Sequence, residues 1–275
     1  DKKVISFCEK NFINLKINTD TEYGFELFKK FNGVNLPTIL FLNSDGSEID
    51  RLIGYSEPSD YLKKISNIKN NINTLSYFLD QYILHSDSTY ISLQIGNKYL
   101  ERNLNDSAQI YLNNVLQGTN QLEIQEAKYK LAFLEYENGN FKKLLQFIDK
   151  NPNSDFSYSG LRAMIRHYRS IQDTTLELKY YEKLIEYFPA NPTALNSYAW
   201  RMSELEINLE KALMKAQQAV ELSSENPQSQ SNILDTEAEI LWKLGKIEDA
   251  IIIINRAIKI NPEYEYFNEQ KEKFL

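Results

Sequence analysis

Residues 231 to 262 carry the clearest pattern of hydrophobic and polar positions in the chain. Apolar residues recur there three or four positions apart, the spacing that places side chains on one face of an α-helix. Gly245 interrupts the pattern, and Pro262 closes it because proline cannot continue a helix. The stretch therefore predicts two short amphipathic helices joined by a tight turn. The apolar residues of the pattern are Leu234, Leu241, Leu244, Ile247, Ile254 and Ile258.

Small residues stand where these two helices would touch. Ala238, Ala250 and Ala257 are spaced so that the paired helices can approach each other closely. Together with Gly245 and Pro262, this spacing resembles the tetratricopeptide repeat, a helical hairpin of about 34 residues. The resemblance implies that such hairpins stack on one another as a solenoid.

Four earlier copies of the pattern precede this one, so we predict five repeats over residues 89–264. Two of the copies depart from the pattern, because Leu144 and Glu177 occupy the position that Ala250 holds in the last copy. A large side chain at a helix contact predicts looser packing in the second and third repeats. The residues that correspond to Ala238 in the earlier copies are Gly96, Ala132, Ile165 and Trp200.

Residues 1 to 66 follow a different pattern, in which helical segments alternate with short β-forming runs. Residues 11–17 (NFINLKI) alternate apolar and polar side chains, which predicts a strand. A helix follows and ends at Gly33, since glycine readily takes the left-handed conformation that closes helices. The last helix of this part opens at Pro58.

Two further runs predict a β-hairpin. Residues 38–42 (TILFL) are continuously apolar, which is typical of a strand covered on both faces. Asp45 and Gly46 follow, and this dipeptide favours a tight turn because it tolerates positive φ. Residues 49–53 then predict the return strand.

The order of these elements, with Leu36-Pro37-Thr38 ahead of the apolar run, resembles the C-terminal two-thirds of a thioredoxin domain. In that family the proline follows a cis peptide bond, a form that is accessible chiefly before proline. The backbone beside it holds a substrate strand. The resemblance therefore implies a cis Leu36–Pro37 bond and a substrate-binding loop at Leu36, Pro37 and Thr38. A trans proline that opens a strand is the alternative.

The Cys-x-x-Cys motif of that family is not present in the chain. Cys8 is the only cysteine, and it stands too close to Pro37 to take the family's catalytic position. We interpret Cys8 as a small buried apolar residue, with a free redox thiol as the alternative. We expect residues before Asp1 to supply the missing strand and cysteines; otherwise the remaining strands pair directly with each other.

Composition limits the classes of partner and cofactor. The formal net charge of −7 argues against a broad basic surface for nucleic acid. No stretch resembles a membrane span. One cysteine and two distant histidines, His85 and His167, provide neither a disulfide framework nor a multi-residue metal site. No cofactor is predicted.

The predicted fold class is mainly α. It consists of a partial thioredoxin-like α/β module and an α-α superhelical solenoid of tetratricopeptide type. The module covers residues 1–66, a connecting helix and linker cover 67–88, the repeats cover 89–264, and a capping helix covers 265–275.

The first helix of each stacked hairpin usually lines a concave surface that binds extended peptides. A strip of arginines on that surface suits an acidic peptide or a carboxylate terminus, because guanidinium groups bind carboxylates bidentately. Solvated or internally paired arginines, for example with Glu204, are the alternative. For the aromatic residues the alternative is packing between helices. The candidate groove residues are Tyr129, Phe133, Tyr136, Arg162, Arg166, Arg169 and Arg201.

Two functional hypotheses follow. The first is a thioredoxin-family thiol–disulfide oxidoreductase with a repeat domain for partner binding, present here without its Cys-x-x-Cys and so unable to exchange disulfides by itself. The alternative is a non-catalytic adaptor that binds peptides in the repeat groove. Proteins that combine these two modules resemble bacterial exported or periplasmic proteins, which favours that location over the cytoplasm.

Overall fold

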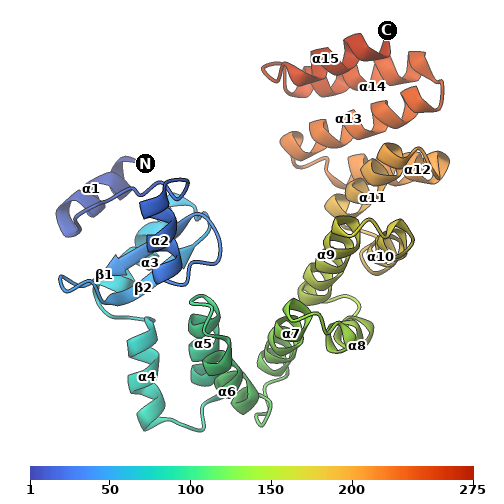
Figure 1. The fold of residues 1–275 in the computed structure, drawn as a ribbon. Helices are drawn as coiled ribbons and strands as arrows, with labels where there is room; N and C mark the ends of the chain where they lie inside the picture. The colour runs from blue at the N-terminus through green and yellow to red at the C-terminus, as the bar shows by residue number, and fades with distance from the viewer. The chain divides into compact units, whose positions relative to one another are not determined.

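The computed structural model describes residues 1–275, which form two compact units, Asp1–Leu144 and Leu145–Leu275. Helices dominate both units (Figure 1), and the one sheet has two strands. None of the helices combines the length and the apolar character needed to cross a membrane. The N-terminal unit contains α1 (Lys2–Asn11), α2 (Glu22–Lys30), β1 (Thr38–Leu42), β2 (Glu48–Ile53), α3 (Pro58–Lys69), α4 (Leu75–Leu84), α5 (Thr89–Leu100), α6 (Asn105–Val115) and α7 (Gln121–Glu137). The C-terminal unit contains α9 (Asp155–Ser170), α10 (Thr174–Tyr187), α11 (Pro192–Leu205), α12 (Leu209–Leu222), α13 (Pro227–Lys243), α14 (Ile247–Ile260) and α15 (Tyr266–Phe274), and the division falls within α8 (Lys142–Lys150).

The predicted hairpin is confirmed. β1 and β2 pair in antiparallel register, and Gly46 in the connecting turn has a φ of +84°, which a residue with a Cβ rarely adopts. Phe41 of β1 is buried and packs with Ile65 and Ile68 of α3, whose start at Pro58 agrees with the prediction. Burial against α3, together with contacts from Phe7 and Cys8 of α1, therefore holds the small sheet in place.

The predicted strand at residues 11–17 is wrong. α1 continues through Asn11, and the residues after it join no sheet, so that the side chains of Ile13 and Leu15 are 94% and 82% exposed. An alternating pattern becomes a strand only where a neighbouring strand accepts its hydrogen bonds. β1 also differs from the prediction, because Leu42 is exposed and only Phe41 is buried.

Charged side chains join the hairpin to α5. Asp50 of β2 is fully buried, and its two carboxylate oxygens accept hydrogen bonds from Lys98 at 2.6 Å and from Arg102 at 2.8 Å. A buried carboxylate is stable only when it is paired and hydrogen-bonded. This cluster therefore fixes β2 against the C-terminal end of α5.

Helices α4 and α15 lie on either side of the helix pairs in the sequence. α4 contacts both β2 and α5, and its Phe78 packs with Ile91 and Ile95 of α5. α15 contacts α13 and α14, and it buries Phe267 and Phe274. A helix is thus present in each segment where the sequence predicts a connecting or capping helix.

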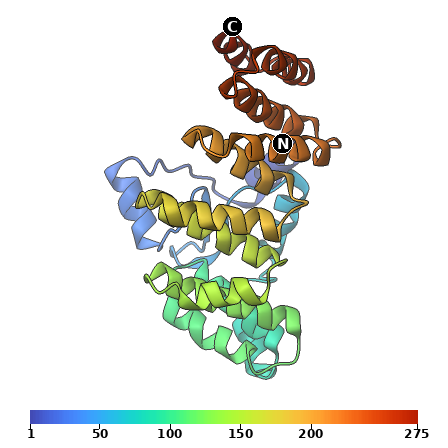
Figure 2. The ribbon, with the colours of Figure 1, turned by 90° about the vertical axis from the view of Figure 1, so that its right-hand side faces the viewer.

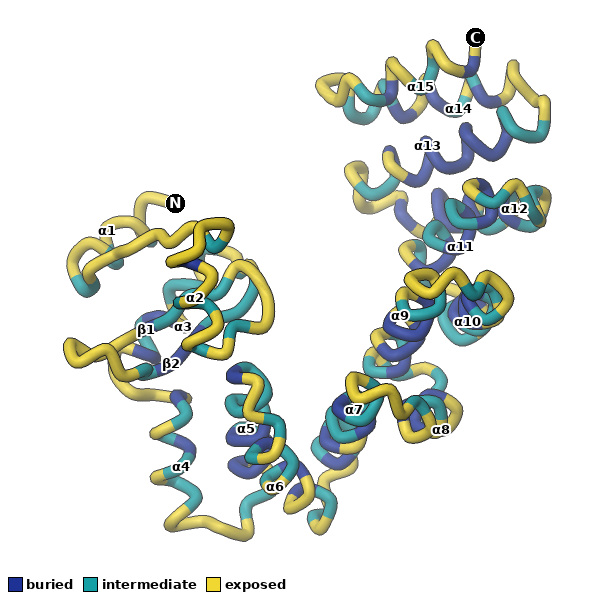
Figure 3. Tube along the Cα trace, viewed as in Figure 1, coloured by how far each residue is buried: buried dark blue, intermediate teal, exposed yellow.

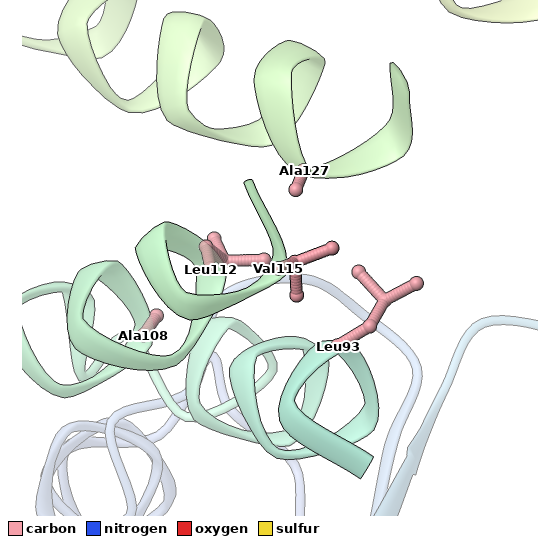
Figure 4. Packing of buried hydrophobic residues seen from close by; sticks show 5 residues of the cluster. All are labelled: Leu93, Ala108, Leu112, Val115 and Ala127. Atoms are coloured by element: carbon pink, nitrogen blue, oxygen red, sulfur yellow. The ribbon is translucent and has the colours of Figure 1, made fainter. Parts of the chain in front are cut away.

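Consecutive helices pack as pairs in α5–α6, α9–α10, α11–α12 and α13–α14. Figure 4 shows the contact of the first pair, where Ala108 and Leu112 of α6 lie against α5. A Cβ atom on Gly96 of α5 would lie only 2.9 Å from the side chain of Leu112. The close approach predicted from small residues is therefore real at this position.

Stacking is most complete around α13. This helix contacts α11, α12, α14 and α15, and buried residues occupy most of its length (Figure 3). Ala238, Ala250 and Ala257, the small residues of the sequence pattern, are fully buried. Figures 1 and 2 show α11 to α15 following one another in successive layers.

The prediction of looser packing at Glu177 and Leu144 is wrong. Both side chains are buried, with 1% and 0% exposure. The carboxylate of Glu177 in α10 accepts two hydrogen bonds from the guanidinium of Arg201 in α11, at 2.7 and 2.8 Å. A bidentate ion pair thus replaces the small residue of the pattern.

We expect Glu177→Ala to destabilise the protein by about 3 kcal/mol, because it leaves the largely buried Arg201 guanidinium without its main partner. Urea unfolding followed by circular dichroism measures the loss. The double variant Glu177→Ala/Arg201→Ala is the control and should lose less, since it leaves no unpaired charge. Equal losses in the single and double variants would contradict the ion-pair explanation.

Candidate peptide-binding face

Three of the four candidate arginines lie on α9, whose local sequence sets their direction, and the fourth, Arg201, lies on α11. The hydroxyl of Ser154 caps the helix by accepting a hydrogen bond from the backbone N–H of Ser157 at 3.1 Å. One face of α9 is apolar and buried, and this leaves the arginines on the opposite, exposed side. The buried apolar residues are Leu161, Ala163, Met164 and Ile165, and the exposed arginines are Arg162, Arg166 and Arg169.

Two of the four candidate arginines are engaged within the protein. Arg201 binds Glu177 bidentately and also donates to Glu204 at 3.1 Å. Arg169 donates to the same Glu204 carboxylate at 3.0 Å. The structure thus brings Arg169 and Arg201 together around one acid, in agreement with the alternative of internally paired arginines.

The other two arginines, Arg162 and Arg166, have no ion-pair partner. Both are exposed, and they stand one helical turn apart on the same face of α9. The guanidinium of Arg162 lies 5.7 Å from the ring centre of Tyr158, close enough for a cation–π contact. Tyr158 is itself held by an edge contact with Phe188, with ring centres 5.1 Å apart. This pair of guanidinium groups is available to bind an anion.

The candidate aromatic residues lie on α7 in the N-terminal unit. The ring centres of Tyr129 and Phe133 are 5.7 Å apart, and those of Phe133 and Tyr136 are 5.2 Å apart. All three are half-buried. A row of rings that contact one another agrees with the packing alternative.

The loop at Leu36, Pro37 and Thr38 is exposed except for the half-buried threonine. The Leu36–Pro37 bond is cis, as the resemblance implies. The carbonyl of Pro37 accepts a hydrogen bond from the N–H of Gly54 at 2.9 Å, and the hydroxyl of Thr38 donates to the carbonyl of Asn35. The loop is therefore held by contacts with its own chain neighbours and with the end of β2.

Cys8 lies in an apolar environment that disfavours its thiolate form. It is half-buried on α1 and packs against the cluster that contains Phe41, Ile65 and Ile68. Burial raises the pKa of its thiol, which lowers the fraction present as the reactive thiolate. The interpretation of Cys8 as a buried apolar residue fits this environment.

The sequence did not reveal a buried acidic pair on α13. Asp235 is only 7% exposed and its Oδ1 atom has no hydrogen-bond partner, while Glu239, one turn later, pairs with Lys273 of α15 at 2.6 Å. Burial, reinforced by the charge of Glu239 and opposed by that of Lys273, raises the pKa of Asp235 to about 7. Acidic residues on a repeat helix look like surface residues in a sequence, so only packing against α15 reveals this pair.

These observations define a mainly helical repeat protein with an exposed basic face on α9. No protein-family model and no curated protein matches the chain. Several solved structures of tetratricopeptide-repeat proteins match the chain at low similarity. The first is YrrB, a TPR protein with an unusual peptide-binding site, at 12% identity over 71% of this chain and 97% of that one, with a TM-score of 0.47.

Two further structures match in the same way. The complex of the TPR2AB domain of yeast Sti1 with pHSP90 matches at 11% identity over 78% of this chain and 94% of that one, with a TM-score of 0.39. The TPR domain of P58(IPK) matches at 14% identity over 73% of this chain and 58% of that one, with a TM-score of 0.36. The helical-repeat character of this chain is evident from its own helix pairs, α5–α6, α9–α10, α11–α12 and α13–α14.

We expect Asp235→Asn to change the pH dependence of stability. The pKa of Asp235 is about 7 in the folded protein and about 4 in an unfolded chain. Well below a pH of about 4, the carboxyl group is protonated in both states. Between about pH 4 and about pH 7 it ionises in the unfolded chain but stays protonated in the folded protein, so the free energy of unfolding falls as the pH rises. The variant lacks this loss, so its free energy of unfolding should rise relative to the wild type over that interval, by up to about 1.4 kcal/mol per pH unit.

Urea unfolding at several pH values between about 4 and 8 measures this difference. Glu263→Gln, which removes an exposed carboxylate ahead of α15, is the matched control and should show a nearly constant difference. A constant difference for Asp235→Asn as well would show that its carboxyl group titrates normally in the folded protein.

Proposed function

We propose that this protein is a non-catalytic adaptor that binds an acidic peptide segment of a protein partner on the exposed face of α9. The observation that carries the proposal is the pair Arg162 and Arg166, which are exposed, one turn apart and free of internal ion pairs. Guanidinium groups in this arrangement match two carboxylates of an extended acidic peptide.

The charge balance of the chain favours a peptide over a nucleic acid. The net charge is −7, which disfavours a wide basic surface. Binding to nucleic acid generally depends on many phosphate contacts over a wide basic surface. A short acidic segment needs only the few guanidinium groups that α9 presents.

The oxidoreductase hypothesis lacks support in these residues. Disulfide exchange begins with attack of a thiolate on a disulfide, and the Cys-x-x-Cys mechanism uses a second thiol to release the mixed disulfide, whereas Cys8 is the only cysteine of this sequence and burial raises its pKa. We therefore give preference to the adaptor function. An exported or periplasmic location belongs to the proposal and depends on the resemblance alone.

The thioredoxin-like origin of residues 1–66 remains part of this proposal. In its support, α2, β1, β2 and α3 follow one another in the order that the resemblance implies. We propose that the loop at Leu36, Pro37 and Thr38 serves as a second contact for a protein partner. The division at residues 67–88, 89–264 and 265–275, and the groove that includes Tyr129, Phe133 and Tyr136, are likewise proposals.

A binding experiment with labelled peptides tests the adaptor function. Fluorescence anisotropy would compare a decapeptide rich in Glu and Asp with one in which these residues are Lys. We expect the acidic peptide alone to bind, and more weakly as salt rises, because salt screens exposed charges. Arg162→Gln/Arg166→Gln should weaken its binding about tenfold, equivalent to about 1.4 kcal/mol.

Arg256→Gln is the matched control, since Arg256 is an exposed arginine on α14, the second helix of its pair. It should bind the acidic peptide as tightly as the wild type does. Equal weakening in both variants would assign the effect to net charge, and no weakening in the α9 variant would exclude this face as the site.

A further inference from the structure

A cavity of about 450 Å³ is formed by residues of the N-terminal unit, whereas α9 belongs to the C-terminal unit. The hairpin, the end of α3, the start of α4 and Arg102 after α5 surround it. Its volume falls in the range of small-molecule sites, about 300 to 1,000 Å³. No residue of the proposed adaptor site lines it, so any ligand that it holds is a different one.

One part of the cavity wall is apolar. Ile49 of β2, Ile68 of α3, and Leu75 and Leu79 of α4 contribute aliphatic side chains to the lining. Of these, Ile68 is buried and the other three are half-buried. An aliphatic chain of a ligand would be removed from water here, at a gain of about 0.8 kcal/mol per methylene group.

Two charged groups of the lining, Glu48 and Arg102, already have partners within the protein. The carboxylate of Glu48 accepts hydrogen bonds from Arg51 at 2.8 and 2.5 Å and pairs with Arg102 at 2.9 Å. Arg102 also donates to Asp50 and to the carbonyl of Lys98, both at 2.8 Å. The charges of these groups are balanced within the protein, so they neither require nor favour a charged ligand.

Two exposed polar groups of the lining, Asn71 and Lys69, have donors that no residue of the protein uses. The Oδ1 atom of Asn71 accepts the hydroxyl groups of Thr74 and, at 2.8 Å, of Ser76, while its side-chain NH₂ group donates to no residue. The ammonium group of Lys69 donates to Asn11 and has no carboxylate partner, which leaves two of its three hydrogens. A matching ligand group is therefore an acceptor with negative charge.

We propose that this cavity binds a small carboxylate with an aliphatic chain, the carboxylate facing Lys69 and Asn71 and the chain facing the aliphatic wall. A free alkanoate and the C-terminal residue of a peptide that ends in leucine both present this chemistry. The cavity would give the protein a second, independent ligand beside the acidic segment bound by α9.

Titration of the whole chain with sodium octanoate tests the site. Methyl-detected NMR should show shifts concentrated at Ile49, Ile68, Leu75 and Leu79, and calorimetry should give a saturable isotherm. N-acetyl-glycyl-leucine, titrated in parallel, distinguishes a peptide terminus from an alkanoate by which of the two binds more tightly. Octylamine, with the same chain and the opposite charge, should not bind.

Single substitutions test the polar contact at Lys69 and the aliphatic wall at Leu79 independently. Lys69→Met should weaken octanoate binding about tenfold, the loss of one charge-assisted hydrogen bond at about 1.4 kcal/mol. Lys63→Met on the exposed surface of the same helix is the control and should bind as the wild type does. Leu79→Trp, which fills the cavity, should abolish binding of both carboxylates.

Shifts scattered over the surface, binding of octylamine as tight as that of octanoate, or equal behaviour of Lys69→Met and Lys63→Met would overturn the proposal. The NMR map of the unmodified protein distinguishes these outcomes even if Leu79→Trp fails to fold. Arg162→Gln/Arg166→Gln should bind octanoate normally, so failure of the adaptor function and failure of this site are distinguishable.

Discussion

One pair of short helices cannot bury all of its apolar residues between its two members. Each pair therefore depends on packing against the next pair. In the C-terminal unit, α13 meets this need by contacting helices before and after it in the chain. Its Ile233, Leu234 and Ile240 are buried, as is Ala238. Small side chains at the contacts matter because helices held farther apart would leave these residues partly hydrated. The faces used for stacking then determine which faces remain for a partner.

The basic face on α9 is a face that helix stacking leaves exposed. Burial of the apolar side of the helix turns the arginines to the other side. Two of the four candidate arginines are neutralised within the protein. Arg201 of α11 pairs with Glu177, and Arg169 of α9 pairs with Glu204. Arg162 and Arg166 differ from Arg169 in forming no ion pair with an acid of another helix, although all three share one face of α9.

The sequence predicted local features well and contacts between distant segments poorly. The β-hairpin around Gly46 depends on the conformations of a few consecutive residues, which sequence patterns report directly. The strand expected at residues 11–17 depended on a neighbouring strand, and local alternation cannot supply one. In the candidate site, helical spacing placed Arg162 and Arg169 on one face, because periodicity is also a local property. Which of the two is paired depends on Glu204, on a different helix, so the sequence could not decide it.

The contacts of β2 with the segments that follow α2 and α5 are polar, and this has a geometric consequence. Arg51 of β2 is 2% exposed; it binds Glu48 and donates to the carbonyl of Phe31 at 2.7 Å and to that of Glu101 at 3.1 Å. An apolar contact permits small sliding movements, whereas a planar guanidinium with several fixed acceptors allows one arrangement only. The hairpin, α3 and α4 all contribute walls to the cavity near Arg102, so its shape requires these elements to keep their mutual positions. The directional hydrogen bonds of Arg51 meet that requirement in a way that apolar packing alone would not.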